Sequence, residues 1–208
     1  MNQMDYSSET ENKIVASATE VFLESGRDGA RMQEIADRAG INKALLHYYF
    51  RTKNRLYDKV FETIISFFLS NMLESVKERT DAETMLRTFI DKYIDALAKR
   101  PQIVRFVLWE IERGGEGFAN AAKKTFAKKG FNTIPLIPII QEAVDRGEIR
   151  PVDPVQLTLS IVGMCIYPFV AKPLIERIIP GVQVYSKPFL EQRKQEIFRM
   201  VWSGIAPE

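Results

Sequence analysis

The stretch QEIADRAGINKALLHYYFRTK, residues 33–53, decides how the rest of this chain is interpreted. Residues 33–38 are predicted to form a short helix, which Gly40 breaks because glycine accepts the positive φ of a sharp turn. Asn42 is expected to cap a second helix, residues 43–50, by accepting a hydrogen bond from a free backbone N–H. Two short helices joined by a tight glycine turn are typical of a helix-turn-helix, whose second helix enters the DNA major groove.

The charge of this region favours contact with a polyanion. The range from Arg38 to Val60 contains six basic residues and one acid, Asp58, whereas the whole chain of 208 residues has a formal charge of only +2. Positive charge is therefore concentrated where a phosphate backbone would lie. The alternative is that the helix pair is a plain packing unit and that its basic residues form a solvated surface. The six basic residues are Arg38, Lys43, Arg51, Lys53, Arg55 and Lys59.

The composition, with 46% hydrophobic and 27% charged residues, is that of an ordinary globular protein. The sole cysteine, Cys165, cannot form an internal disulfide, and the single histidine excludes a multi-histidine metal site. No secretory signal is visible, and the most apolar stretch, residues 157–170, is shorter than the roughly 20 residues that span a bilayer. Phosphate-loop, dinucleotide and hydrolase signatures are absent. We therefore expect a cytoplasmic protein that is not an enzyme and has no membrane partner, metal or cofactor.

Helical periodicity continues through the rest of the chain. Ser8 and Glu11 have the spacing of a capping box, which would open a helix that Gly26 closes. A long helix is predicted from Lys53 to about Val76, and at ~1.5 Å per residue it would extend about 40 Å. Sustained period-two alternation is absent, so no strand is expected. Further helices are predicted to start near Thr80, Pro101, Phe118, residues 133–138, Pro154 and Ser186.

The predicted fold class is all-α, in two parts. Residues 1–52 are expected to form a three-helix unit that contains the helix-turn-helix and binds DNA. Residues 53–208 are expected to form a larger helical bundle. The helix from Pro154 is hydrophobic on nearly all sides, which indicates burial on more than one face.

Three groups of closely spaced residues in the first 60 positions form a pattern known from one protein family. They are Ile14, Ala18, Val21, Phe22 and Gly26; Ile35, Ala36, Ala39, Gly40, Ile41 and Asn42; and Leu46, His47, Tyr48, Tyr49, Phe50, Lys53 and Leu56. In these positions the chain resembles the tetracycline-repressor-like (TetR) family of bacterial transcriptional regulators. The resemblance implies a homodimer that binds a palindromic operator through successive major grooves. It also implies that residues 53–208 form a ligand-binding and dimerisation domain, in which a ligand pivots the long helix and releases the DNA.

Position and chemistry predict the DNA contacts. Lys43 can donate to guanine, whereas Ala44 and Leu45 can contact a thymine methyl group. Lys53, which starts the long helix, looks like the family's phosphate anchor. His47 is expected to contact DNA, and the alternative is a capping or packing role. The full predicted set is Arg31, Gln33, Lys43, Ala44, Leu45, His47, Tyr48, Tyr49, Arg51, Thr52 and Lys53.

Other residues of this stretch have different expectations. Leu46 and Phe50 are predicted to lie in the core of the small unit. The family often has threonine or serine where this chain has Ala30 and Arg31; arginine can reach a phosphate but is a poor helix cap. His47 stands where the family usually has tyrosine, which is expected to change the operator preference.

The C-terminal part offers candidates for a ligand pocket and a dimer interface. An aromatic residue beside an acid, as in Trp109 and Glu110, can hold a cationic or amphipathic ligand. The predicted pocket residues are Phe106, Trp109, Glu110, Met164 and Tyr167, although aromatic residues at helical spacing are more often core. Two helices from each subunit would form an apolar four-helix interface. The predicted interface residues are Leu159, Gly163, Ile166, Phe189, Ile197 and Val201.

The sequence thus predicts a ligand-responsive transcriptional repressor. Its partners would be double-stranded operator DNA, a second copy of the chain, and an apolar or amphipathic small molecule that releases the DNA. The alternative is a helical small-molecule-binding protein without DNA-binding activity. In that case binding to DNA would be absent or would not change in Lys43→Ala and Lys53→Ala. An enzyme would need a polar catalytic cluster, which the sequence does not show.

Overall fold

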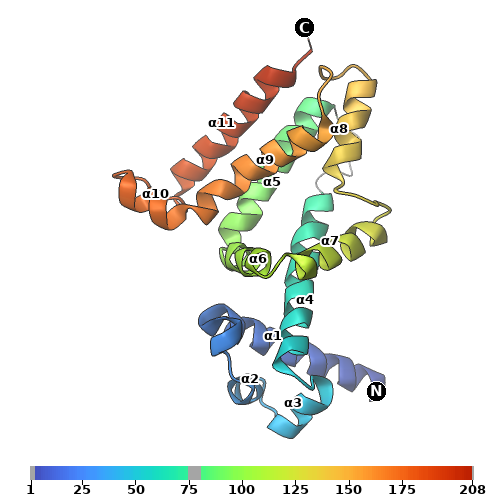
Figure 1. Cartoon of the computed structure of the whole chain (residues 1–208), viewed down its shortest axis with the longest axis vertical. Helices are drawn as coiled ribbons and strands as arrows, with labels where there is room; N and C mark the ends of the chain where they lie inside the picture. The colour runs from blue at the N-terminus through green and yellow to red at the C-terminus, as the bar shows by residue number, and fades with distance from the viewer. Residues whose placement is uncertain (1–2, 75–80, 208) are drawn as a thin grey trace. The chain divides into compact units, whose positions relative to one another are not determined.

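The computed structural model describes residues 3–74 and 81–207, and these residues contain helices and no strands (Figure 1). The all-α prediction is confirmed. The helices are α1 (Gln3–Gly29), α2 (Met32–Arg38), α3 (Lys43–Tyr49), α4 (Lys53–Glu74), α5 (Ala82–Lys99), α6 (Gln102–Glu112), α7 (Glu116–Lys128), α8 (Leu136–Asp145), α9 (Pro154–Val170), α10 (Lys172–Ile178) and α11 (Lys187–Ile205).

The chain divides into two compact units, Met1–Ile65 and Ser66–Glu208. The sequence predicted a boundary between residues 52 and 53, at the start of α4, whereas this division falls inside α4. The first turns of α4 explain the difference, because they contribute to the core of the N-terminal unit. Leu56 and Tyr57 are fully buried there, and the Tyr57 ring meets the Phe22 ring of α1 edge to face at 5.2 Å between centroids.

The core of the N-terminal unit follows the apolar pattern of the sequence. Leu46 is fully buried and Phe50 is 8% exposed, so their assignment to the core is confirmed. α1 already starts at Gln3, so the predicted start at Ser8 is wrong. Gly26, with φ 69° and ψ 174°, interrupts the helical conformation near the predicted end.

The turn between α2 and α3 forms as the sequence predicts. Gly40 takes φ 66°, in the left-handed region that favours glycine. The side chain of Asn42 then accepts a hydrogen bond from the N–H of Leu45 at 2.8 Å and caps α3. Arg31 occupies the N-cap position of α2 without a capping side-chain hydrogen bond, which agrees with the expectation that arginine caps poorly.

The C-terminal unit is built on three helices, α5, α9 and α11, which lie side by side (Figure 1). α8 packs against α9, and α6 contacts both α7 and α9. Asp81 caps α5 by accepting a hydrogen bond from the N–H of Thr84 at 2.8 Å. The predicted cap, Thr80, lies outside the described residues.

Pro168 inside α9 leaves one backbone carbonyl without its helical donor, and α11 supplies a replacement. Because proline has no N–H, the carbonyl of Met164, four residues earlier, loses its usual partner. Arg193 of α11 donates a hydrogen bond to this oxygen at 3.0 Å. α9 continues to Val170 and is followed by α10 at a bend of 66°. The sequence did not predict α10 as a separate helix.

Two further features bear on the classes of function. Among the described helices none is by itself long and apolar enough to cross a membrane, although α9 and α10 together reach that length and composition across their bend. Within residues 3–74 and 81–207 no group of three or more His, Cys, Asp or Glu side chains is arranged to hold a metal ion.

Candidate nucleic-acid interface and ligand cavity

α3 has one face inside the core and one face in solvent. Leu46 occupies the inner face, while Lys43, Ala44 and His47 are exposed and Tyr48 is 80% exposed. The Tyr48 ring packs edge to face against the Tyr49 ring, at 5.5 Å between ring centroids. Tyrosine is enriched where proteins bind partners, because its ring packs and its hydroxyl hydrogen-bonds. The outer face of α3 is therefore a candidate binding surface.

The predicted DNA-binding residues are spread over the start of α2, the outer face of α3 and the turn into α4. Nine of the eleven are exposed, and the other two, Tyr49 and Lys53, are partly buried. All eleven belong to the N-terminal unit. Their contact with DNA stays a prediction at this point.

Both α3 and α4 begin with a lysine and have no acidic residue in the first turn. The N-terminus of a helix carries a partial positive charge, so a lysine there typically costs about 0.3–1 kcal/mol of stability. Lys43 and Lys53 therefore occupy positions that helix stability disfavours but that suit an approaching anion.

Three of the predicted contact residues also have structural roles that the sequence did not reveal. Lys53 donates to the carbonyl oxygens of Asp28 at 3.0 Å and Ala30 at 3.2 Å. Thr52 caps α4, since its hydroxyl oxygen accepts a hydrogen bond from the N–H of Arg55 at 3.2 Å. The third is Gln33, whose amide donates to the Asp37 carboxylate at 2.8 Å. Only for Thr52 was a signal available, because threonine is a preferred N-cap residue.

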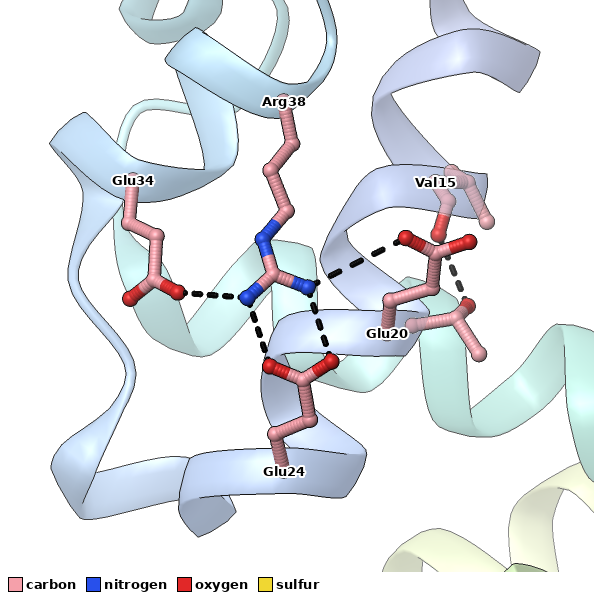
Figure 2. A network of polar contacts seen from close by, with 6 residues as sticks. Val15, Glu20, Glu24, Glu34 and Arg38 are labelled. Atoms are coloured by element: carbon pink, nitrogen blue, oxygen red, sulfur yellow. Dashed lines mark hydrogen bonds and ion pairs between the residues drawn. The ribbon is translucent and has the colours of Figure 1, made fainter.

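Two of the six basic residues counted in the sequence are already paired with acids. Arg38 lies between three carboxylates, from Glu24 and Glu20 of α1 and from Glu34 of its own helix (Figure 2). The nearest oxygens of Glu34 and Glu20 are 2.8 Å and 3.9 Å away. Lys59 forms an ion pair with a glutamate of α1 at 3.1 Å. All these acids precede residue 38, so the count over residues 38–60 missed them.

Of the other four basic residues, Lys53 is held by two backbone carbonyls, and the remaining three keep their side chains available to a partner. Lys43, Arg51 and Arg55 form no ion pair with any residue in the described part of the chain, and all three are exposed. They lie at the start of α3 and on either side of the start of α4. The unpaired positive charge of this region is therefore carried by fewer residues, and is more localised, than the sequence indicated.

Arg38→Met is expected to lower the melting temperature at pH 7, because Arg38 links α1 to α2. Its hydrogen bond holds the pKa of Glu24 below the ordinary value. A carboxylate with a lowered folded-state pKa contributes stability above its unfolded pKa and loses it as pH falls through the folded value. The difference in melting temperature between Arg38→Met and the parent protein should therefore be smaller at pH 3 than at pH 7. Thermal unfolding followed by circular dichroism at the two pH values would measure it. Arg199→Met, which removes an exposed pair with Glu196, is the control; an unchanged Arg38 effect at pH 3 would contradict this explanation.

The C-terminal unit contains a cavity of about 730 Å³. Its wall is formed by the last turns of α4, by α5 and α7, and by the connection from α7 to α8, with one residue each from α8 and α9. Two aromatic contacts shape it: the Tyr93 ring lies 5.6 Å from the Phe68 ring and 5.6 Å from the Phe89 ring. The aromatic residues of the wall are Phe68, Phe89, Tyr93, Phe118, Phe126 and Phe131.

The described wall contains none of the five predicted pocket residues. Phe106 is fully buried against Trp109, at 5.8 Å between ring centroids, and Glu110 is 5% exposed. The carbonyl oxygen of Met164 accepts a hydrogen bond from Arg193, and the Tyr167 side chain is 58% exposed. Helical spacing alone did not distinguish aromatic residues of the core from those of a cavity wall, because both face inward. The cavity thus offers a different location for a ligand.

The predicted dimer residues fall into two groups. Ile197 is fully buried and Val201 is 6% exposed within one protomer, so these two side chains are not on the surface. Ile166 and Phe189 are partly buried. Leu159 is 55% exposed, and the exposed Gly163 lies one turn further along α9.

α9 is buried on one face only within the protomer, although its sequence indicated burial on more than one. Ile161 and Cys165 are fully buried, and burial raises the pKa of the Cys165 thiol to about 12. The opposite face is apolar and exposed. Its exposed large side chains are Val155, Leu159, Tyr167 and Val170, and Met200 of α11 is exposed as well.

Comparison with known proteins identifies similar sequences and folds. Residues 14–60 match the family described as bacterial regulatory proteins, tetR family, and residues 83–201 match the tetracyclin repressor-like C-terminal domain. The HTH-type transcriptional regulator RutR of Escherichia coli O157:H7 is 24% identical over 198 residues, which cover 93% of this chain and 89% of RutR.

Two solved structures share the fold. FadR from Bacillus subtilis in complex with stearoyl-CoA has a TM-score of 0.69 at 22% identity, and AibR in complex with isovaleryl coenzyme A and operator DNA has a TM-score of 0.66 at 23% identity; each comparison covers 92% of this chain and 97% of the other.

Proposed function

The chain belongs to the tetR family of bacterial regulatory proteins, and we propose that it is a repressor that binds a palindromic operator as a homodimer and is released by a small molecule. The observation that carries the DNA-binding part is the outer face of α3. It presents Lys43, His47 and Tyr48 to solvent on a helix whose inner side is fixed by the buried Leu46. A recognition helix needs this combination of a rigid base and free polar side chains.

α4 supplies a mechanical connection for the proposed response. Its first residue, Lys53, is tied to the carbonyls of Asp28 and Ala30, whereas its last turns contribute Phe68 and Met72 to the cavity wall. A molecule that pushes against those two side chains acts on the same continuous helix that begins at the helix-turn-helix. Two half-sites can be bound together only at a spacing of ~34 Å or its multiples, so a small pivot of α4 in each subunit is enough to prevent it.

The exposed apolar face of α9 supports the proposed homodimer. Large apolar residues recur along this face at helical spacing, and a second copy would cover them. Gly163 in the middle of the face permits a close approach of two helices. Obligate homodimer interfaces are of this apolar kind, and a two-fold axis gives each half-site its own recognition helix.

The cavity supports a small-molecule effector of apolar or amphipathic character. FadR and AibR, which share the fold, were solved with coenzyme A thioesters, and the AibR structure also contains operator DNA. A regulator of this type acts on the chromosome and needs no catalytic step, so we propose that the chain works in the cytoplasm and is not an enzyme.

The test is a selection of DNA sequences by the full-length protein from a random pool. We expect an enriched palindrome whose half-site centres are about one helical turn, 10–10.5 base pairs, or a multiple apart. Affinity for it should fall steeply as salt rises, and a cell extract rich in small metabolites should release it. Failure to enrich any sequence would favour the alternative, a small-molecule-binding protein without DNA-binding activity. An enriched site without two-fold symmetry would contradict the homodimer.

A further inference from the structure

The cavity of the C-terminal unit has a buried end and an open end. Phe68, Phe89 and Tyr93 are 6%, 7% and 8% exposed, so the wall they form is closed off from solvent. Lys123 of α7 and residues 132–134 also line the cavity but are exposed. A ligand therefore enters between α7 and the connection to α8.

The polar groups of the wall are distributed unevenly between these two ends. Among the described lining residues the cation is Lys123, no acid is present, and the amide of Asn132 and the hydroxyl of Thr133 lie at the open end. The buried end has the hydroxyl of Tyr93 and otherwise only hydrocarbon and aromatic surface. A charged group there would lose its hydration without compensation. A ligand must therefore place its apolar part inside and any charge at the mouth.

The charge at the open end specifies the sign of the polar group. Lys123 is the charged residue of the described wall, is exposed, and makes no ion pair with any other described residue. A charge at the mouth of an apolar cleft attracts the opposite sign. The head group that fits is an anion.

The volume of the cavity specifies the size of the apolar part. At about 30 Å³ for a water-sized group such as a methylene, a straight chain of about 12–18 carbons takes roughly 360–540 Å³. The cavity of about 730 Å³ holds such a chain and leaves room at its mouth. Short chains of about four carbons would leave most of the apolar wall uncovered.

We propose that the ligand of this cavity is a single-chain amphiphile: a fatty acyl chain of about 12–18 carbons whose anionic head stays at the mouth beside Lys123. The head is either the carboxylate of a free fatty acid or the phosphates of a coenzyme A thioester, which share the same chemistry at this site. The inference rests on the proposed function only where it names this ligand as the effector, because binding itself requires no DNA.

The experiment measures direct binding to the full-length protein, without DNA, by isothermal titration calorimetry. The probes are straight-chain carboxylates and the matching coenzyme A thioesters with 4, 8, 12 and 16 carbons, below their micellar concentrations. The expected affinity rises about fourfold for each methylene that enters the cavity and levels off once the chain fills it. Whichever of the two series binds more tightly identifies the source of the anionic head.

Two variants and a neutral ligand test the head group separately. Lys123→Glu is expected to weaken binding of the 16-carbon anion several-fold and to leave hexadecanol unaffected. Lys92→Glu, the same charge change at an exposed site on α5 outside the wall, should alter neither. Both sites are exposed, so both variants should fold.

Several results would overturn the inference. They are equal affinities for 4 and 16 carbons, no binding of either series, or equal effects of the two variants. If long-chain anions bind as expected but do not release the selected operator, the inference stands and the proposed regulation by this cavity fails. If another compound releases the operator while no long-chain anion binds, the regulatory function stands and the inference is wrong.

Discussion

Leu159→Arg is expected to convert the proposed dimer to a monomer and to abolish stable operator binding. Leu159 is 55% exposed in the middle of the apolar face of α9. A partner can bury only the exposed half of each Leu159 side chain, so each leucine contributes about 0.8–1.7 kcal/mol, half of the value for full burial. A two-fold axis places the substitution in the interface twice, so the loss in dimer affinity is at least about 10-fold, before any cost of desolvating two like charges. Sedimentation equilibrium and gel shifts on the selected operator would measure both effects.

A matched control separates loss of the interface from a general effect of surface arginine. Ile111 of α6 is 60% exposed, and Ile111→Arg should leave the protein dimeric and bound to its operator. If Leu159→Arg also remains a dimer, the interface does not include this face of α9. The next candidates would then be Leu174 and Ile178 of α10, which are 56% and 66% exposed.

The helix-turn-helix could be predicted closely because its signals are local. Gly40 and Asn42 act on backbone groups within three residues of themselves, and Leu46 follows the apolar period of a single helix. The pairing of Arg38 could not be predicted in this way. Its two partners on α1 come close only after that helix has packed against α2, and neither partner is marked by sequence spacing.

The C-terminal unit shows the same limit more strongly. The apolar positions of an amphipathic helix such as α11 do not reveal whether they face the same protomer or a partner, and Ile197 and Val201 proved to be inside. Lys194, on the inner side of that helix, is 8% exposed and pairs with Asp95 of α5 at 2.6 Å. Its charge in the sequence would have placed it outside. The cavity wall likewise joins five helices and a connection, so spacing within any one of them could not define it.

Lys43→Ala and Arg51→Ala are each expected to weaken operator binding, and together they should cause the largest loss in affinity of any exposed pair in the N-terminal unit. Each residue is exposed and lacks an ion pair with any described residue, so its full charge is available to DNA. A base contact contributes about 1–3 kcal/mol, and each phosphate contact changes the salt slope, d log K/d log[salt], by about 0.9. Fluorescence anisotropy with labelled operator at four salt concentrations would give both quantities.

Lys59→Ala provides the decisive comparison. Lys59 carries the same charge as Lys43 and Arg51 but differs from them in the structure, because it is already paired with an acid. Lys59 already forms an ion pair with Glu11 at 3.1 Å, and both side chains are partly exposed, 45% and 38%. An amine that neutralises a carboxylate displaces few counterions from DNA, so the salt slope of Lys59→Ala should equal that of the parent. Equal slope changes for Lys59→Ala and Lys43→Ala would show that DNA displaces Glu11 and that total charge, not unpaired charge, governs binding. A smaller slope only for Lys43→Ala and Arg51→Ala would place the phosphate backbone along the start of α3 and the turn into α4.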